Sequence, residues 1–486
     1  MMQALLPVAN VLGRLMLLFS LAYVIPIGGS LLFHDGIVID FVLAMLINAG
    51  TGILLFVLSR RHVRDLKVRD GFLLVTLSWT LVAAIATTPL LIVYEELSFT
   101  DAFFEMMSAM TTTGATVLTG LDHAPPSINL WRHQLQWLGG LGIIVLAVAI
   151  LPLLGVGGMQ LFKAEAPGPM KETRVTERIG QTARALWLVY LGLTLLCIVS
   201  LRIAGMDWFD AVCHAFSAMS LGGFSTRDAS VSAWNSPAIE AVLVVFMLLA
   251  GINFATHFLA WRSRNLRCYW LDAEARAYIG LVLASCVGIA AFLFAHGTYP
   301  EFWTALRHAT FNVVSIATTA GYMSVDFAQW PIFAPLWMLL LSGIASCSGS
   351  TGGGIKMMRT LILYEQAKRE LLRLLHPNLA GLVKLGTMAV PNKVVFAVLG
   401  FTFLYFVTGA TMTFLLLASG LDFVTALTAV VACINNTGPG LGLVGPAQNY
   451  AALSDFQTWV LSITMLLGRL EILTVAVICT PYFWRQ

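Results

Sequence analysis

Long hydrophobic runs separated by short polar stretches recur along the whole chain. Each run is long enough to cross a membrane, because about 20 apolar residues span the roughly 30 Å hydrocarbon core. The runs cover 5–33, 37–58, 71–94, 131–155, 184–204, 236–261, 277–297, 331–364, 393–419 and 456–484. The pattern predicts an all-α polytopic membrane protein with ten crossings and both termini on the same side.

Four shorter windows between these runs share one layout. In each, an alanine holds the second position and a glycine follows twelve residues later. The windows are DAFFEMMSAMTTTGAT (101–116), DAVCHAFSAMSLGGFS (210–225), HATFNVVSIATTAGYM (308–323) and TALTAVVACINNTGPG (425–440). About 12 apolar-leaning residues at 1.5 Å each cannot cross the bilayer, but they fit a re-entrant half-helix. We therefore predict four repeats of membrane helix, pore helix, polar turn and membrane helix.

These repeats and the two runs before them divide the chain into five parts. The expected parts are an N-terminal two-helix domain (1–70), pore repeat 1 (71–160), pore repeat 2 (161–265), pore repeat 3 with a broken outgoing helix (266–380) and pore repeat 4 (381–486). Four repeats of one design predict a pseudo-fourfold arrangement around a single pore.

The polar turn that ends each window points to ion chemistry. Threonine and glycine favour helices poorly, and exposed backbone at membrane depth is tolerated only beside protein or a water-filled cavity. A ring of carbonyls replaces the hydration shell of a cation, and the C-terminal ends of half-helices add negative potential. We name the turns the filter segments: Thr112, Thr113, Gly114; Leu221, Gly222, Gly223; Thr319, Ala320, Gly321; and Asn436, Thr437, Gly438. For any single glycine, close helix packing is the competing interpretation.

Composition and charge place these elements in a membrane with a defined orientation. Hydrophobic residues make up 58% of the chain and charged residues 11%, where soluble proteins carry about 25%. The basic clusters at 60–69, 171–178, 262–267 and 356–373 are expected in the cytoplasm, with the acidic loops outside. The seven cysteines form no CxxC pair, which argues against a disulfide framework or a zinc site.

A glycine- and serine-rich stretch, SGIASCSGSTGGGIKMM (342–358), interrupts the outgoing run of the third repeat. It does not satisfy the phosphate-binding pattern GxxxxGK[ST]. We interpret it as a flexible intramembrane loop that gates the pore, with a packing kink as the alternative. Its expected gate residues are Gly343, Ser346, Ser348, Gly349, Ser350, Gly352, Gly353, Gly354 and Lys356.

Arg469 falls in the middle of the last run and joins the expected gate. An arginine at the centre of a membrane helix costs about 2.5–3.5 kcal/mol or more, so its side chain should face the interior. We expect it to contact the glycine-rich loop and to limit leak, with a purely structural charge bonded to carbonyls as the alternative. Glu471 does not share its helical face and is a poor partner within one helix.

At the four windows the chain resembles the Trk/Ktr/HKT superfamily of potassium translocating subunits. The motifs that carry the resemblance are TTTGAT, GGFST, TTAGY and NNTGPG, and the two extra N-terminal runs resemble the Trk branch. The resemblance implies four filter glycines with potassium at the filter carbonyls. Relatives that favour sodium carry serine at the first glycine, so Gly114 indicates potassium. The residues before the glycines differ (Thr113, Gly222, Ala320 and Thr437), which implies a less uniform filter than in a tetrameric channel.

The same resemblance implies a setting and partners. It implies potassium uptake across a bacterial inner membrane, a gating role for the glycine-rich loop, and contact with membrane lipids. It also implies a homodimer and a cytosolic nucleotide-binding regulatory subunit. Since this chain carries no nucleotide-binding motif, any control by a nucleotide must come from such a partner. Potassium is expected as the transported ion, without an organic cofactor and without a nucleic-acid partner.

Two other classes of function stay open at this point. A proton- or sodium-coupled symporter needs carboxylates at mid-membrane, and Glu471 is the one that falls well inside a run. An intramembrane enzyme needs a nucleophile with a base, and Ser348 and Cys347 have no histidine or lysine at a telling spacing beyond Lys356, one or two turns away. We therefore do not expect an enzyme.

Overall fold

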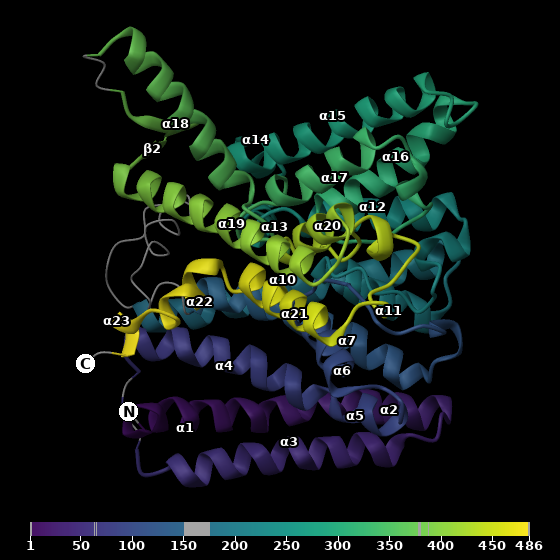
Figure 1. The fold of residues 1–486 in the computed structure, drawn as a ribbon, viewed down its shortest axis with the longest axis vertical. Helices are drawn as coiled ribbons and strands as arrows, with labels where there is room; N and C mark the ends of the chain where they lie inside the picture. The colour runs from purple at the N-terminus through teal and green to yellow at the C-terminus, as the bar shows by residue number, and fades with distance from the viewer. Residues whose placement is uncertain are drawn as a thin grey trace.

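The protein is a bundle of long helices with shorter helices buried between them (Figure 1). The computed structural model describes residues 2–62, 64, 66–149, 175–377, 381–386 and 388–484. Parts of the expected layout, namely the boundary at 160/161, residue 380 and the basic residues at 171–174, lie outside the described residues. A short antiparallel hairpin, β1 (Val383–Leu385) with β2 (Met388–Val390), was not expected from the sequence.

The N-terminal helices pack along each other at one edge of the bundle (Figure 1). They are α1 (Met2–Phe19), the 3-10 turn η1 (Ser20–Tyr23), α2 (Val24–Phe33) and α3 (Val38–Ser59). Asn48 of α3 donates hydrogen bonds to the Met16 carbonyl and to the Ser20 hydroxyl, both at 2.9 Å. Such a bond between helices adds a directional contact where lipid provides no hydrophobic drive.

Four repeats follow, as the sequence pattern predicts. Repeat 1 holds α4 (Val68–Ala86), α5 (Thr88–Val93), α6 (Phe99–Met110), η2 (Leu121–His123) and α7 (Pro126–Ala149). Repeat 2 holds α10 (Val175–Ile203), α11 (Trp208–Ser220), η3 (Ser230–Trp234), α12 (Pro237–Ala250) and α13 (Phe254–Ser263). Repeat 3 holds α14 (Arg267–Leu271), α15 (Ala273–Ala295), α16 (Phe302–Ala317), η4 (Phe327–Gln329), α17 (Phe333–Ile344) and α18 (Met357–Leu375). Repeat 4 holds α19 (Asn392–Ala418), α20 (Phe423–Ile434), η5 (Gly442–Val444), α21 (Asp455–Arg469), α22 (Ile472–Ile478) and α23 (Pro481–Trp484).

The predicted half-helices are α6, α11, α16 and α20, which are 12, 13, 16 and 12 residues long. Three of them begin at a side-chain cap that accepts a backbone N–H in the first turn. The caps are Ser98, Asp207 and Asp422. Such caps satisfy amide groups that a helix start leaves without a partner. A short apolar helix with a polar start is therefore specified locally in these repeats.

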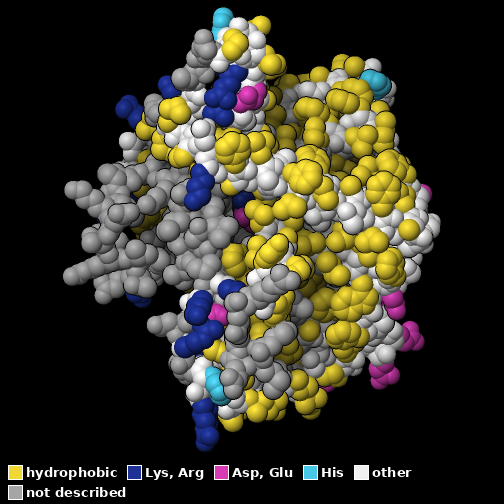
Figure 2. All heavy atoms as spheres, turned by 60° about the vertical axis from the view of Figure 1, so that its left-hand side comes forward, with side chains coloured by type: hydrophobic (Ala, Val, Ile, Leu, Met, Phe, Trp, Pro, Cys, Tyr) yellow, Lys and Arg dark blue, Asp and Glu magenta, His cyan; other side chains and the backbone are white. Residues whose placement is uncertain are grey.

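The outer surface matches a membrane setting. Among the described residues, six helices are long and apolar enough to cross a membrane, and two bent helix pairs pass the same test together. In Figure 2 Lys and Arg gather on the left with a few Asp and Glu among them, and a broad hydrophobic surface lies between them and further Asp and Glu at the right-hand edge. The N- and C-termini lie on the same side of the bundle (Figure 1). The chain is thus a multi-pass, all-α membrane protein.

The prediction of unbroken outgoing helices at 236–261 and 456–484 is wrong. The first is broken between α12 and α13, which meet at 94°, and the second between α21 and α22, which meet at 112°. Asn253 accepts the Ala255 N–H at 2.8 Å and so starts a new helix, α13. Glu471 takes a φ of 59°, which no α-helix accommodates. Each break lies at a polar residue inside an apolar run, Asn253 in the first and Glu471 in the second.

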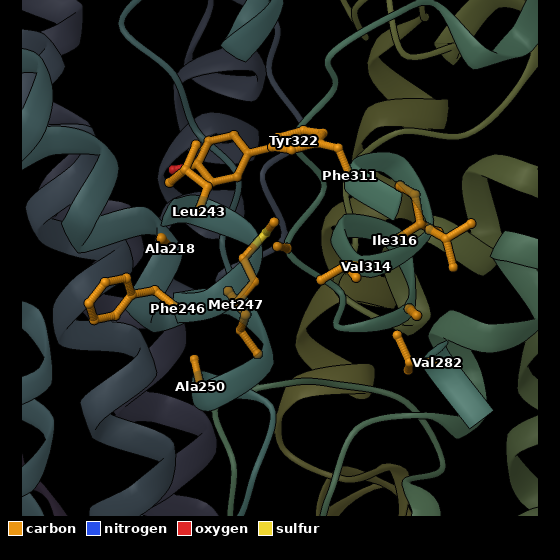
Figure 3. Packing of buried hydrophobic residues seen from close by; sticks show 14 of the residues in the cluster. Ala218, Leu243, Phe246, Met247, Ala250, Val282, Phe311, Val314, Ile316 and Tyr322 are labelled. Carbon is orange, nitrogen blue, oxygen red and sulfur yellow. The ribbon is translucent and has the colours of Figure 1, made fainter. Parts of the chain in front are cut away.

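The interior between repeats 2 and 3 is packed with apolar side chains from several helices. Figure 3 shows Leu243 and Met247 of α12 facing Val314 of α16, with Ala218 of α11 nearby. All four of these side chains are fully buried. This cluster fixes two pore helices relative to each other, which positions the segments that follow them.

Candidate functional site

The four filter segments share one backbone conformation. The first residue of each is left-handed although none is glycine, with φ of 53° at Thr112, 55° at Leu221, 66° at Thr319 and 54° at Asn436. Two residues later the glycines also have positive φ, at 82°, 72°, 83° and 94° for Gly114, Gly223, Gly321 and Gly438. A left-handed backbone is unfavourable for any residue that has a side chain. Because it occurs at the same position in all four segments, we conclude that the packing imposes this geometry.

The segments close into a ring in which each glycine faces the carbonyl of the next repeat. A methyl group added to any of the four glycines would collide with, or press on, that oxygen. The contacts are Gly114 with Gly222 O (2.1 Å), Gly223 with Ala320 O (2.0 Å), Gly321 with Thr437 O (2.1 Å) and Gly438 with Thr113 O (2.7 Å). The order runs through repeats 1, 2, 3, 4 and back to 1. The structure therefore brings all four segments together around one axis, and a side chain at any of the four glycines would shift or press on a neighbouring carbonyl.

Each pore helix holds its own filter segment by an equivalent backbone bond. The middle residue of the segment donates its N–H to a carbonyl in the last turn of the helix. These bonds are Thr113 to Ser108 (2.9 Å), Gly222 to Ser217 (2.9 Å), Ala320 to Ser315 (2.8 Å) and Thr437 to Ala432 (2.8 Å). All four helices thus direct their C-terminal ends, where the helix dipole is negative, toward the ring.

A vestibule opens above the ring. All four filter glycines line it, together with Arg227, Asp228 and Tyr450. Arg227 pairs with Asp210 at 3.3 Å and with Asp122 at 3.4 Å. Partial burial lowers the pKa of Arg227, but these two carboxylates raise it above its usual value overall. The charged side chains that line this polar mouth are Arg132, Arg227 and Asp228, and Arg227 is balanced by its two carboxylate partners.

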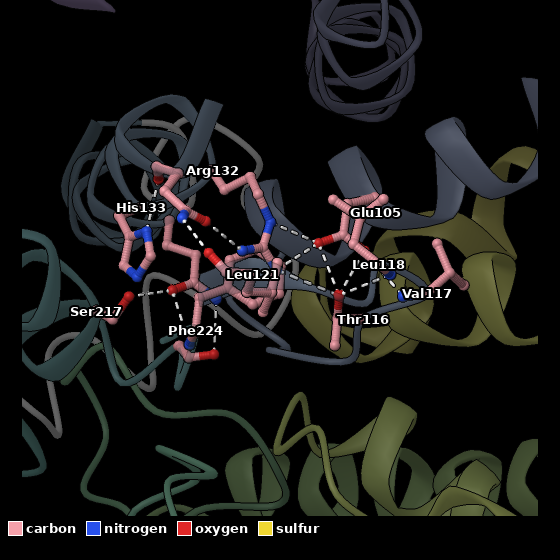
Figure 4. Close-up of polar contacts among 12 residues, drawn as sticks. Glu105, Thr116, Val117, Leu118, Leu121, Arg132, His133, Ser217 and Phe224 are labelled. Atoms are coloured by element: carbon pink, nitrogen blue, oxygen red, sulfur yellow. Dashed lines mark hydrogen bonds and ion pairs between the residues drawn. The ribbon is translucent and has the colours of Figure 1, made fainter. Parts of the chain in front are cut away.

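A buried ion pair supports the first filter segment from behind, and sequence reasoning missed it. Glu105 was assigned to an acidic external loop, which is wrong, because it lies in α6 with no exposed surface. Arg132 of α7, also fully buried, contacts it at 2.7 Å. Figure 4 shows this Glu105 carboxylate receiving hydrogen bonds from Thr116 and Val117, just beyond the glycine. Removing one partner of a buried pair costs about 3–5 kcal/mol, so the pair fixes this strand firmly.

The same arginine reaches the second repeat. Its guanidinium lies 4.2 Å from the ring centroid of Phe224, the residue after Gly223. One side chain therefore links the strands that follow two neighbouring filter glycines. The signal that could have revealed it is the polar start of the run at 131–155, where WRHQLQ places four polar side chains in six positions.

The glycine-rich loop, residues 345–356, lies directly below the ring. It separates α17 from α18, as predicted, although Gly343 still belongs to α17. The N–H of Gly353 donates to Thr319 Oγ1 at 3.1 Å, and Thr351 Oγ1 donates to the Met219 carbonyl at 3.0 Å. A methyl group on Gly353 would lie 2.1 Å from the Asn435 carbonyl. The loop therefore contacts the ends of pore helices from three repeats.

The other expected gate residues lie within this loop or at its end. Ser346, Ser348, Ser350 and Gly352 are buried, Gly349 and Gly354 take positive φ, and Lys356 precedes α18 with a φ of 75°. The N–H of Ser348 donates to Glu274 Oε1 at 2.6 Å. The loop is thus a compact, hydrogen-bonded segment at membrane depth, with glycines where neighbouring atoms leave no room for side chains.

Arg469 is the last residue of α21, at the 112° break, and not the middle of a continuous helix as predicted. It is buried and donates to the carbonyls of Thr351 at 2.8 Å and Gly139 at 3.2 Å. The side chain thus bridges the glycine-rich loop and α7 of repeat 1. Both bonds go to neutral carbonyls, so its positive charge has no carboxylate partner among the hydrogen bonds and ion pairs of the described residues.

Glu471 finds its partner outside its own helix. Its carboxylate pairs with Arg359 of α18 at 2.6 Å, and both side chains are partly buried. The Arg359 guanidinium also lies 4.1 Å from the ring centroid of Phe401 in α19. The helix that leaves the glycine-rich loop is therefore tied to the break in the fourth repeat.

Four re-entrant turns that meet in one ring below a vestibule are typical of a membrane protein of the ion-translocating class. A family model described as "TrkH: Cation transport protein" matches residues 35–484. The Trk system potassium uptake protein TrkH of Halomonas elongata is 46% identical over 480 residues, and that of Salmonella typhimurium is 44% identical over 482, each covering 99% of both chains. The crystal structure of the potassium transporter TrkH from Vibrio parahaemolyticus matches with a TM-score of 0.91 and 43% identity, over 99% of both chains. The chain therefore belongs to the TrkH family of cation transport proteins.

Proposed function

We propose that this protein takes up potassium through the ring of filter segments. Ions enter from the vestibule, lose water at the filter carbonyls, and pass the glycine-rich loop and Arg469 on their way inward. The proposal is supported by the relatives, which are named as Trk system potassium uptake proteins. The observation that carries it is the closed ring. Each of the four glycines lies so close to a carbonyl oxygen of the next repeat that an added methyl group would be only 2.0–2.7 Å from that oxygen.

The geometry explains why a carbonyl ring would act on a cation. The filter segments are buried except for partial exposure at Gly114, Gly223 and Gly321, and their backbone is bonded to the pore helices. A cation that sheds water there finds oxygen ligands and the negative ends of four helices. Because Gly114 carries no hydroxyl, the ring keeps the same ligand type in all four repeats.

The layer beneath the ring is proposed as the gate. The glycine-rich loop contacts the ends of three pore helices, and Arg469 donates a hydrogen bond to the Thr351 carbonyl of the same loop. We propose that opening requires the loop to leave these contacts. Because α18 follows the loop directly, a force on this helix would reach the gate.

The proposed setting is a bacterial inner membrane, with both termini in the cytoplasm. The distribution of charge supports this orientation, since Lys and Arg gather on the side where the termini lie (Figures 1 and 2). We propose that the protein acts as a homodimer with a cytosolic nucleotide-binding regulatory subunit. A coupled symporter is less well supported, because Glu471 and Glu105 are already paired with Arg359 and Arg132.

The test is rubidium-86 uptake into liposomes that contain the purified protein and an imposed potassium gradient. Sodium and lithium are added as competitors, and wild type is compared with Gly114→Ser. We expect uptake that runs down its gradient, excludes sodium, and loses that exclusion in the variant. Gly36→Ser is the matched control, because Gly36 has the same φ of 82° with nothing within 4 Å of an added methyl group.

Two results would count against the proposal in different ways. Uptake that needs a proton or sodium gradient would favour the symporter. Equal sodium and potassium flux in wild type and Gly114→Ser would contradict selectivity at the ring. A loss of discrimination in Gly36→Ser as well would assign the effect to backbone strain instead of the ring.

A further inference from the structure

One filter segment differs from the others in its middle residue. Repeats 1, 3 and 4 have Thr113, Ala320 and Thr437, whereas repeat 2 has Gly222, whose φ is not positive. Backbone conformation therefore does not explain this glycine. Its surroundings do, because a methyl group on Gly222 would lie 2.5 Å from the Cδ atom of Gln136. A side chain from another helix occupies the space that a β-carbon would need.

Gln136 belongs to α7 of repeat 1 and has no exposed surface. Its Nε2 donates to the carbonyl oxygen of Gly222 at 2.6 Å. Its Oε1 accepts from the Ser217 hydroxyl at 2.5 Å and from the Phe224 N–H at 3.3 Å. Figure 4 labels Ser217 and Phe224, the two residues that donate to this oxygen. One amide thus binds the pore helix, the filter carbonyl and the strand beyond the glycine of repeat 2.

The equivalent carbonyls of the other repeats are left to face the ring. No hydrogen bond among the described residues falls on the carbonyls of Thr113, Ala320 or Thr437, whereas that of Gly222 has a donor. Tyr450 donates to the carbonyl of Gly438 at 2.7 Å, but that oxygen belongs to the next residue along the segment. The carbonyls of the four middle residues form one layer of the ring. Among the described residues, a side chain donates a hydrogen bond to this layer at Gly222 of repeat 2 and at none of the other three.

We propose that Gln136 is a positioning residue that sets how well the ring discriminates potassium from sodium. The proposal rests on the function proposed above and deepens it. By holding the Gly222 carbonyl, the amide fixes one of four ligands in place and competes with the ion for its lone pairs. One ligand of the layer then presents a weaker field than the other three.

A weaker ligand field favours the larger ion. Sodium approaches an oxygen more closely than potassium does, so it gains more from a strong carbonyl dipole, while its dehydration costs more. When the Gly222 carbonyl is released, its lone pairs become available and the ring can contract around a smaller ion. Loss of the Gln136 amide is therefore expected to raise sodium occupancy without closing the pore.

The experiment uses the full-length protein in liposomes and measures sodium competition with rubidium-86 uptake. Gln136→Met keeps the length of the side chain and removes the donor. We expect sodium to compete roughly threefold to tenfold more strongly, which is the value of one net hydrogen bond expressed as a ratio. Gln134→Met is the matched control, since Gln134 is a buried glutamine of the same helix whose Nε2 donates to the Ala22 carbonyl at 2.8 Å, away from the ring.

A second pair of variants tests the packing and does not depend on Gln136→Met folding well. Gly222→Ala alone places its methyl group against the Gln136 amide, so uptake should be lost. Combining Gly222→Ala with Gln136→Ala removes the collision, so uptake should return, with sodium competition as high as in Gln136→Met. Thermal unfolding of each detergent-purified variant is measured alongside.

The outcomes separate this proposal from the function on which it rests. Increased sodium competition in Gln136→Met but not in Gln134→Met supports it. Unchanged competition in Gln136→Met, with a clear change in Gly114→Ser, overturns it and leaves the filter intact. No change in either variant contradicts the filter itself. Equal changes in the two glutamine variants, or a double variant as inactive as Gly222→Ala, also overturn it.

Discussion

The ring of filter segments and the layer of helices beneath it differ in how far the four repeats agree. In the ring, four different sequences adopt the same pair of positive φ angles and the same bond to the pore helix. Beneath it, α7 is one helix through its described residues Pro126–Ala149, α12 and α13 meet at 94°, α17 gives way to the glycine-rich loop, and α21 and α22 meet at 112°.

The difference shows where symmetry is needed. An ion that sheds its water needs oxygens on all sides at once, so the backbone of every repeat must match. An opening step needs one part of the molecule to move relative to another, and four equal helices would offer no preferred part. The repeats therefore agree at the proposed filter and diverge at the proposed gate.

The largest expected effect comes from breaking the ring at one point. In Gly321→Ala the new methyl group lies 2.1 Å from the Thr437 carbonyl, so that oxygen must leave its position. We expect rubidium-86 uptake to fall by about a hundredfold or more, which corresponds to about 2.7 kcal/mol or more of added barrier. Gly297→Ala, with φ of 71° and nothing within 4 Å of its methyl group, carries similar strain and should transport normally. Near-normal uptake in Gly321→Ala would show that the ring is not the path.

A smaller effect is expected from the asymmetric layer. Arg469→Met removes a buried positive charge and the two bonds that hold the glycine-rich loop to α7. We expect leak of rubidium-86 in the absence of any partner to rise by about tenfold, because a barrier lowered by about 1.4 kcal/mol gives that factor. Arg276→Met, which removes an exposed arginine from α15, is the control. If Arg469→Met lowers stability without raising leak, the arginine is structural, as the competing interpretation holds.

The smallest effect is expected at the tie between α18 and the fourth repeat. Glu471→Gln keeps the shape of the side chain but removes its charge beside Arg359, and the Glu471 side chain is 31% exposed. The thermal unfolding temperature should fall slightly, by the equivalent of about 1 kcal/mol or less. Glu370→Gln, whose 51% exposed carboxylate pairs with Arg373 at 3.2 Å and with Arg369 at 3.6 Å, is the more exposed comparison and should have a smaller effect. A loss of stability as large as that expected for a buried ion pair would contradict this expectation. It would place the Glu471–Arg359 contact within the gate.

Much of this architecture could be predicted from the sequence because it is specified locally. The alanine-to-glycine spacing of twelve residues predicts the half-helices and the filter segments, and the crowded glycines at 349–354 predict the loop in repeat 3. The breaks after Ala250 and Arg469 escaped prediction, because apolar residues continue on both sides of them. Glu105 and Gln136 escaped it for another reason. Their roles depend on partners 27 and 86 positions away, and no local pattern records such a contact.

The covalent continuity of the four filter segments has a genetic consequence. In a channel assembled from identical subunits, one codon change alters every ligand in a layer simultaneously. Here a single codon addresses one quarter of the circle, as at Gly222, where glycine stands in place of threonine or alanine. Under the proposed function, a heritable change in ion preference can therefore begin in one filter segment while the sequences of the other three stay as they are.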